Sequence, residues 1–187
     1  MILAETLAVF RGERLVFRDV GFAVPAGGAL LLRGPNGAGK SSLLRAVAGL
    51  TPLAAGRLLW NGENALDDLP THAKRIAWLG HLDAVKLALS VGEHVADAAA
   101  LAAVGLESFR DLPAKLLSAG QKRRLALARV IASKAPLWLL DEPTNGLDTR
   151  SIAMLGAVFA RHMQGGGMII ASTHTPLELP EAGILNL

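Results

Sequence analysis

Hydrophobic and polar positions alternate loosely over residues 2–10 and 15–24, as they do in half-buried β-strands. Arg11 and Gly12 stand between the two stretches, and glycine is common where a chain reverses direction. The pattern therefore predicts an antiparallel β-hairpin at the N-terminal end of the sequence.

Further along, the apolar positions form short continuous runs instead of alternating. A run such as 29–33 is typical of a central strand that is covered on both faces. The predicted short strands are residues 29–33, 58–60, 75–79, 137–140 and 168–171, with 183–187 as an edge strand at most.

Between these runs, apolar residues recur at helical spacing. The predicted helices are residues 42–50, the alanine-rich stretch 91–104, 118–131 with Ser118 as its cap, and 151–163. Because strands and helices alternate along the sequence, we predict an α/β fold with a mostly parallel core sheet. A length of 187 residues fits a single domain over residues 1–187.

The composition excludes several classes of protein. The sequence contains no cysteine, which rules out disulfides, thiolate zinc sites and cysteine nucleophiles. A net charge of +3 is a mild excess that does not by itself indicate a nucleic-acid partner. Residues 1–5 lack a basic lead, so we expect no secretory signal, and no uncharged run reaches the roughly 18 apolar residues that a membrane helix needs. A mean hydropathy of +0.38 indicates apolar surface reserved for a partner.

Residues 34–41 read Gly-Pro-Asn-Gly-Ala-Gly-Lys-Ser and fit the phosphate-loop pattern G-x-x-x-x-G-K-[ST] without a mismatch. They lie between a predicted strand and a predicted helix, which is the context that the pattern requires. Glycines let backbone N–H groups turn toward phosphate, and the helix adds the positive end of its dipole. We expect Lys40 to neutralise the β- and γ-phosphates and Ser41 to offer its hydroxyl to Mg²⁺. The sequence therefore predicts a nucleoside triphosphate site.

Two carboxylates, Asp141 and Glu142, follow the apolar run 137–140. A strand that ends beside the phosphate loop would place Asp141 within reach of Mg²⁺, directly or through water. Glu142 suits a base that orients or deprotonates the attacking water. Taken alone, both acids could equally be solvated residues at a strand end. Together with a phosphate loop they predict nucleotide hydrolysis.

Further motifs, in a fixed order along the chain, resemble those of ABC-type ATPases. Residues 117–121 are similar to the LSGGQ signature, with Ala in one glycine position, and residues 141–148 are similar to the Walker B motif and D-loop. His174 follows the last predicted core strand, as the family's switch histidine does. Phe10 stands before Gly12, where the family carries an aromatic residue that stacks on adenine. These motifs cover nearly the whole chain.

The resemblance implies a P-loop ATPase fold with an N-terminal antiparallel β-subdomain and a small helical subdomain at about residues 82–120. It also implies a head-to-tail homodimer, in which each ATP lies between the phosphate loop of one chain and the Ser118 segment of the other. The expected nucleotide-binding residues are Phe10, Gly34, Pro35, Asn36, Gly37, Ala38, Gly39, Lys40, Ser41, Ser42, Ser118, Gly120 and Gln121. The expected catalytic residues are Lys40, His81, Glu142, Asp148 and His174, and the expected Mg²⁺ ligands are Ser41 and Asp141.

Smaller features resemble one branch of the family, the CcmA proteins, which are ATP-binding subunits of cytochrome c maturation systems, or haem exporter ATPases. These features are Gly80-His81 in place of the usual glutamine, Lys86, Leu89-Ser90, Glu93, the short C-terminal end and residues 173–177. The likeness implies ATP hydrolysis that serves haem delivery to apocytochromes. It also implies a CcmB-like membrane subunit, other cytochrome-maturation partners and a peripheral position on the cytoplasmic face of the inner membrane. His81 can donate or accept a hydrogen bond and is the candidate to replace the glutamine.

Two other functions fit the same motifs. The chain could serve another small exporter, or it could be an ABC ATPase that acts on ribosomes or nucleic acid without a transporter. The second class usually carries two cassettes or long insertions, so we expect no nucleic-acid partner. The segment 82–90 contains apolar Val85, Leu87 and Leu89. It suits a docking groove for a membrane subunit, and a buried helix accounts for it almost as well.

Other chemically notable residues are expected to have structural roles. We expect a solvated helix face, with nucleotide or lipid-headgroup contact as the alternative, for Lys122, Arg123, Arg124 and Arg129. We expect surface or capping histidines and no haem ligands at His72, His94 and His162. We expect core packing for Trp60, Trp78 and Trp138.

Overall fold

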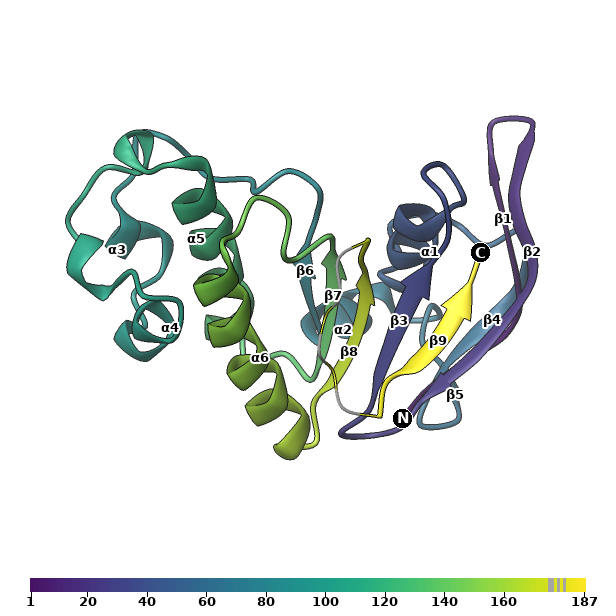
Figure 1. Cartoon of the computed structure of the whole chain (residues 1–187). Coiled ribbons are helices and arrows are strands. Elements are labelled where there is room, and N and C mark those ends of the chain that lie inside the picture. The colour runs from purple at the N-terminus through teal and green to yellow at the C-terminus, as the bar shows by residue number, and fades with distance from the viewer. Residues whose placement is uncertain (175–176, 178, 180) are drawn as a thin grey trace.

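The computed structural model describes residues 1–174, 177, 179 and 181–187, and within them it shows two β-sheets with helices packed around them (Figure 1). The first sheet is antiparallel, with the strand order β2-β1-β4-β5. Its strands are β1 (Ile2–Arg11), β2 (Arg14–Val24), β4 (Ala55–Trp60) and β5 (Glu63–Asn64). The predicted hairpin is confirmed, with its turn at Gly12 and Glu13, one residue later than expected.

The second sheet is parallel, with the strand order β6-β7-β8-β3-β9. Its strands are β3 (Ala29–Arg33), β6 (Ile76–Leu79), β7 (Leu137–Asp141), β8 (Met168–Ser172) and β9 (Gly183–Asn186). Strands β3, β7 and β8 occupy the middle of the sheet and are largely buried, as their apolar runs predict. β9 lies at the edge. The α/β fold with a parallel core sheet is therefore confirmed.

Successive residues along the parallel strands face two different cores. Leu30 packs with α1 (Lys40–Val47) and the antiparallel sheet. Leu31 packs on the opposite face, where α5 (Ala119–Ala132) and α6 (Thr149–Gln164) cover the sheet. Because side chains alternate across a strand, one apolar run supplies both layers. The helix α1 thus lies between the two sheets (Figure 1).

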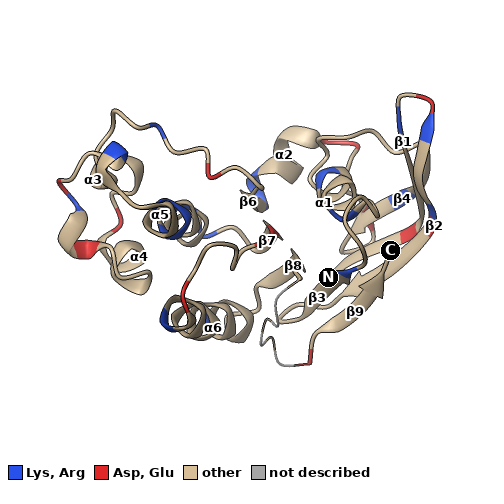
Figure 2. Ribbon diagram, turned by 45° about the horizontal axis from the view of Figure 1, so that its top comes forward, with Lys and Arg blue, Asp and Glu red and all other residues tan. Residues whose placement is uncertain are grey.

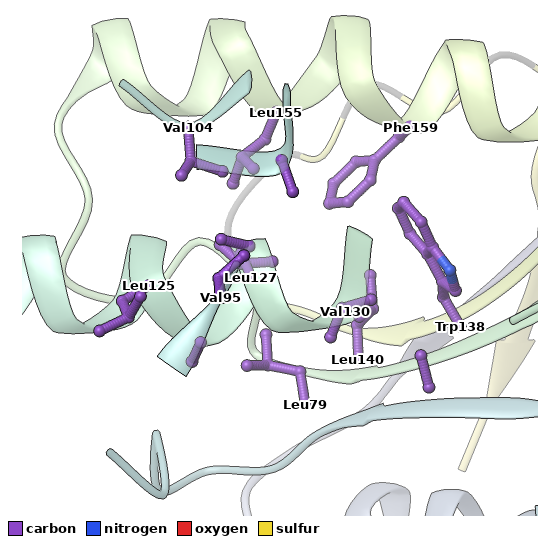
Figure 3. Packing of buried hydrophobic residues seen from close by; sticks show 14 of the residues in the cluster. Leu79, Val95, Val104, Leu125, Leu127, Val130, Trp138, Leu140, Leu155 and Phe159 are labelled. Atoms are coloured by element: carbon purple, nitrogen blue, oxygen red, sulfur yellow. The ribbon is translucent and has the colours of Figure 1, made fainter. Parts of the chain in front are cut away.

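The second core is rich in contacts between α6 and the sheet. Trp138 of β7 packs edge-on against Phe159 of α6, with ring centroids 6.3 Å apart (Figure 3). Trp138 is buried, and Trp60 and Trp78 are partly buried against the other core, so the expected packing of the tryptophans is confirmed. Among the described helices, none has the length and apolar character of a membrane span.

Short helices occupy the chain between β6 and α5, on the side of α5 that faces away from the antiparallel sheet (Figure 1). They are α3 (Val91–His94), α4 (Ala98–Ala103), η1 (Glu107–Phe109) and η2 (Ala114–Leu116), while α2 (Leu69–Lys74) precedes β6. The prediction of one helix over 91–104 is wrong. Val95 is extended, and the Asp97 side chain accepts hydrogen bonds from the N–H groups of Ala99 and Ala100 and so begins a second helix.

Candidate functional site

The phosphate loop connects β3 to α1, and its backbone conformation depends on glycine. Gly39 has φ +108°, and a Cβ atom at this position would lie 2.9 Å from the Val16 side chain. Gly34 has φ +141°, and its Cβ would lie 2.5 Å from a backbone oxygen of Leu187. A side chain at either position would therefore strain or displace the loop. The Lys40 ammonium folds back across it and donates to the carbonyls of Gly34 at 2.8 Å and Pro35 at 3.0 Å.

A cavity of about 700 Å³ opens beside this loop. Its lining residues come from the hairpin, the phosphate loop and the ends of the parallel strands: Arg11, Arg14, Val16, Asn36, Gly37, Gly39, Lys40, Ser41, Ser42, His81, Asp141, Glu142, Asn145 and His174. The volume is that of a site for a small molecule. The structure thus brings most of the expected phosphate-loop and catalytic residues together from segments far apart in sequence.

Asp141 is buried at the end of β7, directly opposite Ser172 of β8 in the strand register. The Ser172 hydroxyl donates to Asp141 Oδ1 at 2.6 Å. This hydrogen bond fixes the carboxylate at the cavity wall, where Ser41 also lies. Ser172 has no place in the sequence motifs. Sequence reasoning missed this residue. The one signal in the sequence is that Ser172 ends a core strand two residues before His174.

Glu142 occupies a strained backbone conformation. Its φ of +51° falls in the left-handed region, which for a non-glycine residue costs about 1–3 kcal/mol. Its N–H donates to Ser172 at both the backbone oxygen, 3.1 Å, and the hydroxyl, 3.2 Å. Such strain is typical of active sites, where neighbouring groups hold a residue in the orientation that the chemistry needs.

The Glu142 carboxylate contacts His174, and both residues line the cavity. The His174 backbone N–H donates to Glu142 Oε2 at 3.2 Å, and His174 Nε2 lies 3.4 Å from Oε1. His174 is half-exposed and Glu142 is mostly buried. The pair can therefore face a ligand in the cavity from the side of the strand ends. Asn145, which also lines the cavity, had no predicted role.

Ser118, Gly120, Gln121 and Asp148 line a separate small pocket of about 200 Å³. Ser118 caps α5 through a reciprocal pair of hydrogen bonds with Gln121, in which each side chain accepts from the other residue's backbone N–H. Asp148 caps α6 by accepting from the Ser151 N–H at 2.7 Å, and hydrogen bonding to Ser151 lowers the pKa of its carboxyl. On one chain, the phosphate-loop cavity and the pocket at Ser118 are therefore two separate sites.

The structure does not place Phe10 at the cavity. Phe10 is 49% exposed and pairs with Leu15, whereas Arg11 pairs with Arg14 and both arginines line the cavity. Because neighbouring strand residues point to opposite faces, Phe10 faces away when Arg11 faces inward. Figure 2 shows basic residues on both strands near the hairpin turn. Within the described residues, Gly34, Pro35 and Ala38 also lie outside the lining, although they belong to the loop itself.

Several expectations outside the motifs need correction. The helix after Ser118 does not present its arginines as one solvated face. Arg123 is buried, and Arg124 and Arg129 donate to backbone carbonyls of other segments. His72 is fully buried, with Nε2 2.8 Å from the Val47 carbonyl at the end of α1. It is therefore no surface residue, but its contact with the last carbonyl of α1 is the capping role that was expected as the alternative.

The other two histidines also make contacts within the chain. His94 lies 2.9 Å from a backbone carbonyl through Nε2, and the His162 ring stacks on Trp138 at 3.8 Å. Two of the residues that carried the likeness to the CcmA branch, Thr175 and Pro176, lie outside the described residues.

Comparison with known proteins identifies the family of this chain. The sequence matches the ABC transporter family over residues 17–145. "Cytochrome c biogenesis ATP-binding export protein CcmA" of Paramagnetospirillum magneticum is 50% identical and covers 98% of this chain and 92% of its own length. The protein with the same description from Rhodospirillum rubrum is 49% identical and covers 98% and 84%.

A solved structure described as "Structure of ATP binding subunit of ABC transporter" has 26% identity and a TM-score of 0.84, and covers 93% of this chain and 79% of its own. Family match, close relatives and fold all agree with the motifs. The chain therefore belongs to the ABC transporter family and, within it, to the CcmA proteins.

Proposed function

We propose that this ABC-type ATPase hydrolyses ATP as the energy-coupling subunit of a CcmAB-like complex that serves haem delivery in c-type cytochrome biogenesis. The observation that carries the proposal is the cavity in which Lys40, Ser41, Asp141 and Glu142 come together. The relatives' description as cytochrome c biogenesis export proteins supplies the biological setting. We treat residues 1–187 as one ATPase domain, with residues 82–120 as its helical subdomain.

The phosphates of ATP would lie against the phosphate loop and the start of α1. Lys40 already has its ammonium at the loop, held by two carbonyls, and it would exchange these for phosphate oxygens. The backbone N–H groups at the start of a helix and the helix dipole favour the same negative charge. Arg11, Arg14 and Val16, at the hairpin end of the cavity, would contact the base and sugar in place of Phe10.

The residues present fit a magnesium ion that arrives with the nucleotide. Ser41 supplies a hydroxyl and Asp141 a carboxylate in the same cavity, and oxygen ligands of this kind suit Mg²⁺ together with phosphate oxygens and water. The ion would neutralise charge on the phosphates. The hydrogen bond from Ser172 holds the Asp141 carboxylate at the cavity wall, where it would face that ion.

Glu142 would act as the general base for the attacking water. Its carboxylate lines the cavity one residue beyond Asp141 and is oriented by the His174 backbone N–H. A carboxylate held in this way accepts a proton from water as the water adds to the γ-phosphate. His174 would contact the γ-phosphate, and His81, which also lines the cavity, would take the place of the family glutamine.

The second pocket would complete the site on another copy of the chain. The Ser118 oxygen accepts from the Gln121 N–H, and its hydroxyl hydrogen can donate to an anion. One ATP held between the phosphate loop of one chain and Ser118 and Gly120 of its partner would bring Asp148 to the interface. This arrangement is the head-to-tail homodimer that the family resemblance implies.

A membrane partner would dock on the segment 82–90. These residues lie outside helices and strands, so a buried helix does not account for them. Leu82 is 81% exposed, and Leu87 and the nearby Leu116 are also exposed. Exposed large apolar side chains of this kind suit a protein partner. We propose a CcmB-like membrane subunit as that partner, on the cytoplasmic face of the inner membrane.

The test combines catalysis with partner recovery. Glu142→Gln should retain ATP binding, lose steady-state turnover and trap the nucleotide-bound dimer, because the amide cannot accept the proton. Unchanged hydrolysis in this variant would remove Glu142 from its role. A pull-down from solubilised membranes should recover a small multi-span protein with cytochrome-maturation partners, and recovery of an unrelated transporter would overturn the proposed setting.

A further inference from the structure

Arg123 is the most deeply buried arginine of α5, and both of its terminal nitrogens bond to two other segments, while Nε has no hydrogen-bond partner among the described residues. Its side chain is 5% exposed. Nη2 donates to the carbonyls of Asp141 and Glu142, both at 2.6 Å. Nη1 donates to the Gly80 carbonyl at 2.9 Å and to Asp83 Oδ1 at 2.8 Å. One guanidinium therefore joins the start of the segment 80–84 to the backbone of the proposed general base.

The two carbonyls bound by Nη2 lie on either side of the Glu142 Cα atom, where the backbone is in the left-handed conformation. A strained residue keeps such a conformation only if its surroundings hold both flanking peptides. Arg123 contacts both of these peptides. The Asn145 N–H also donates to the Glu142 carbonyl, at 3.1 Å, so the following turn depends on the same oxygen.

At its other end, Arg123 holds the chain that leads into the proposed docking segment. Gly80 and Asp83 flank His81 and the highly exposed Leu82. Arg129, two turns further along α5, donates to the Ala84 carbonyl at 3.0 Å. Both arginines anchor this segment to α5. Of the two, Arg123 is the one that the structure also shows bonded to Glu142.

We propose that Arg123 is a positioning residue that fixes the Glu142 backbone and couples it to the segment 80–84. Displacement of this segment by a bound partner would move Gly80 and Asp83, and through the planar guanidinium it would move the carbonyls that orient Glu142. Lysine could not replace arginine here, because an ammonium lacks the rigid fork that reaches two acceptors on each side. The inference rests on the proposed function for the catalytic role of Glu142, but its structural part does not.

The first experiment compares Arg123→Lys with the matched variant Arg129→Lys in steady-state ATP hydrolysis. Arg123→Lys should lower kcat about 10- to 100-fold, as small misplacements of a catalytic group do. KM for MgATP should change by less than about twofold, because the phosphate loop is intact. Arg129→Lys should alter neither value by more than about twofold. Equal kcat values in the two variants would overturn the proposal.

The second experiment does not depend on activity. Amide hydrogen exchange in Arg123→Lys should accelerate both in residues 80–84 and at Asn145, whereas Arg129→Lys should accelerate it in residues 80–84 alone. Asp83→Asn, which leaves the contacts to Asp141 and Glu142 in place, should resemble Arg129→Lys. Unchanged exchange at Asn145 in Arg123→Lys would disprove the link. A wild-type chain that hydrolyses no ATP would refute the proposed function instead, and the exchange result would still decide this inference.

Discussion

The helices α1 and α5 begin in opposite ways, although α1 of one chain and α5 of its partner are proposed to face the same phosphate. At α1 the capping position is Gly39, and among the described residues no side chain accepts from the first N–H groups. At α5 the side chains of Ser118 and Gln121 satisfy each other's N–H groups. We call the start of α1 open, because no side chain of the described residues caps it, and the start of α5 closed, because its own side chains cap it.

This difference indicates how a binding site can be shared between two chains. Unsatisfied N–H groups at a helix start need an acceptor, and a phosphate supplies it. The start of α1, with Lys40 beside it, can therefore bind nucleotide within one chain. The start of α5 satisfies the N–H groups of Ser118 and Gln121 by its own side chains, and it can still offer the Ser118 hydroxyl hydrogen and the Gly120 N–H. We infer that α1 determines affinity, whereas α5 acts on a partner's nucleotide and determines turnover.

The largest effect is expected from a substitution at Ser118, at the closed start of α5. Ser118→Arg places a bulky cation where the partner's γ-phosphate should come, so hydrolysis should fall by about 10²–10³-fold, the range for loss of one transition-state donor. ATP affinity of the single chain should stay within about twofold, because the phosphate loop is untouched. Steady-state hydrolysis, nucleotide titration and light scattering at saturating MgATP measure these three properties. A variant that stays monomeric and hydrolyses ATP at the wild-type rate would refute the division of roles.

The second largest effect is expected from a substitution at Lys40, at the open start of α1. Lys40→Met keeps an unbranched side chain that is one atom shorter and removes the charge at the phosphates. ATP affinity should fall about 10- to 100-fold, the value of one hydrogen bond to a charged group. Arg45→Met, which removes an exposed charge from the other end of α1, is the control and should bind ATP normally. Equal affinity in both variants would mean that α1 does not determine binding.

A smaller effect shows how far the nucleotide site extends beyond α1. Arg11→Ala should weaken ATP binding by about tenfold at most, because stacking of a guanidinium on a base is worth roughly 1 kcal/mol. Phe10→Ala should leave binding unchanged, since that side chain faces away from the cavity. Titration with ATP and with triphosphate alone separates base from phosphate contacts. A larger loss of ATP affinity in Phe10→Ala than in Arg11→Ala would assign the adenine contact to Phe10.

The smallest effect concerns the far end of α1, where His72 bonds to the last carbonyl of the helix. Burial lowers the pKa of His72, so the unfolded chain binds a proton more readily than the folded chain. Stability should therefore fall as the pH drops below about 6.5, by at most about 1.4 kcal/mol per pH unit for one group. Burial also lowers the pKa of His162, which adds a slope of the same sign.

The matched variant for this effect is His72→Gln, which keeps a donor near the Val47 carbonyl. It should show a shallower dependence of unfolding free energy on pH between 7 and 5.5 in urea titrations. A slope identical to that of the wild type would assign the pH dependence to other groups.

Much of the site was predictable because its residues form contiguous motifs. The phosphate loop, the acids after β7 and the cap at Ser118 each depend on a few neighbouring residues, and the structure has the expected strand or helix at each place. The local signals failed where a competing local signal was present, as at Asp97, which begins a new helix inside the alanine-rich stretch.

Other features could not be predicted, because they depend on which distant segments meet. Arg123 reads as one of several basic residues on a helix, yet it is buried against Gly80 and Glu142, more than 15 residues away on either side. Phe10 is the conspicuous aromatic residue of the hairpin, but the strand register turns Arg11 and Arg14 toward the cavity instead. The segments that pack together decide which side chains are buried and which face the cavity, and the residue type alone does not.

The amino-acid sequence alone determined the α/β class, the phosphate loop and the carboxylates after a buried strand, because propensity and motif chemistry are encoded locally. The tertiary structure decided that β7 and β8 lie side by side, so that Ser172 orients Asp141, and that one arginine holds the strained peptide at Glu142. These contacts require a defined strand order and register, which arise only when the whole chain closes around its two cores.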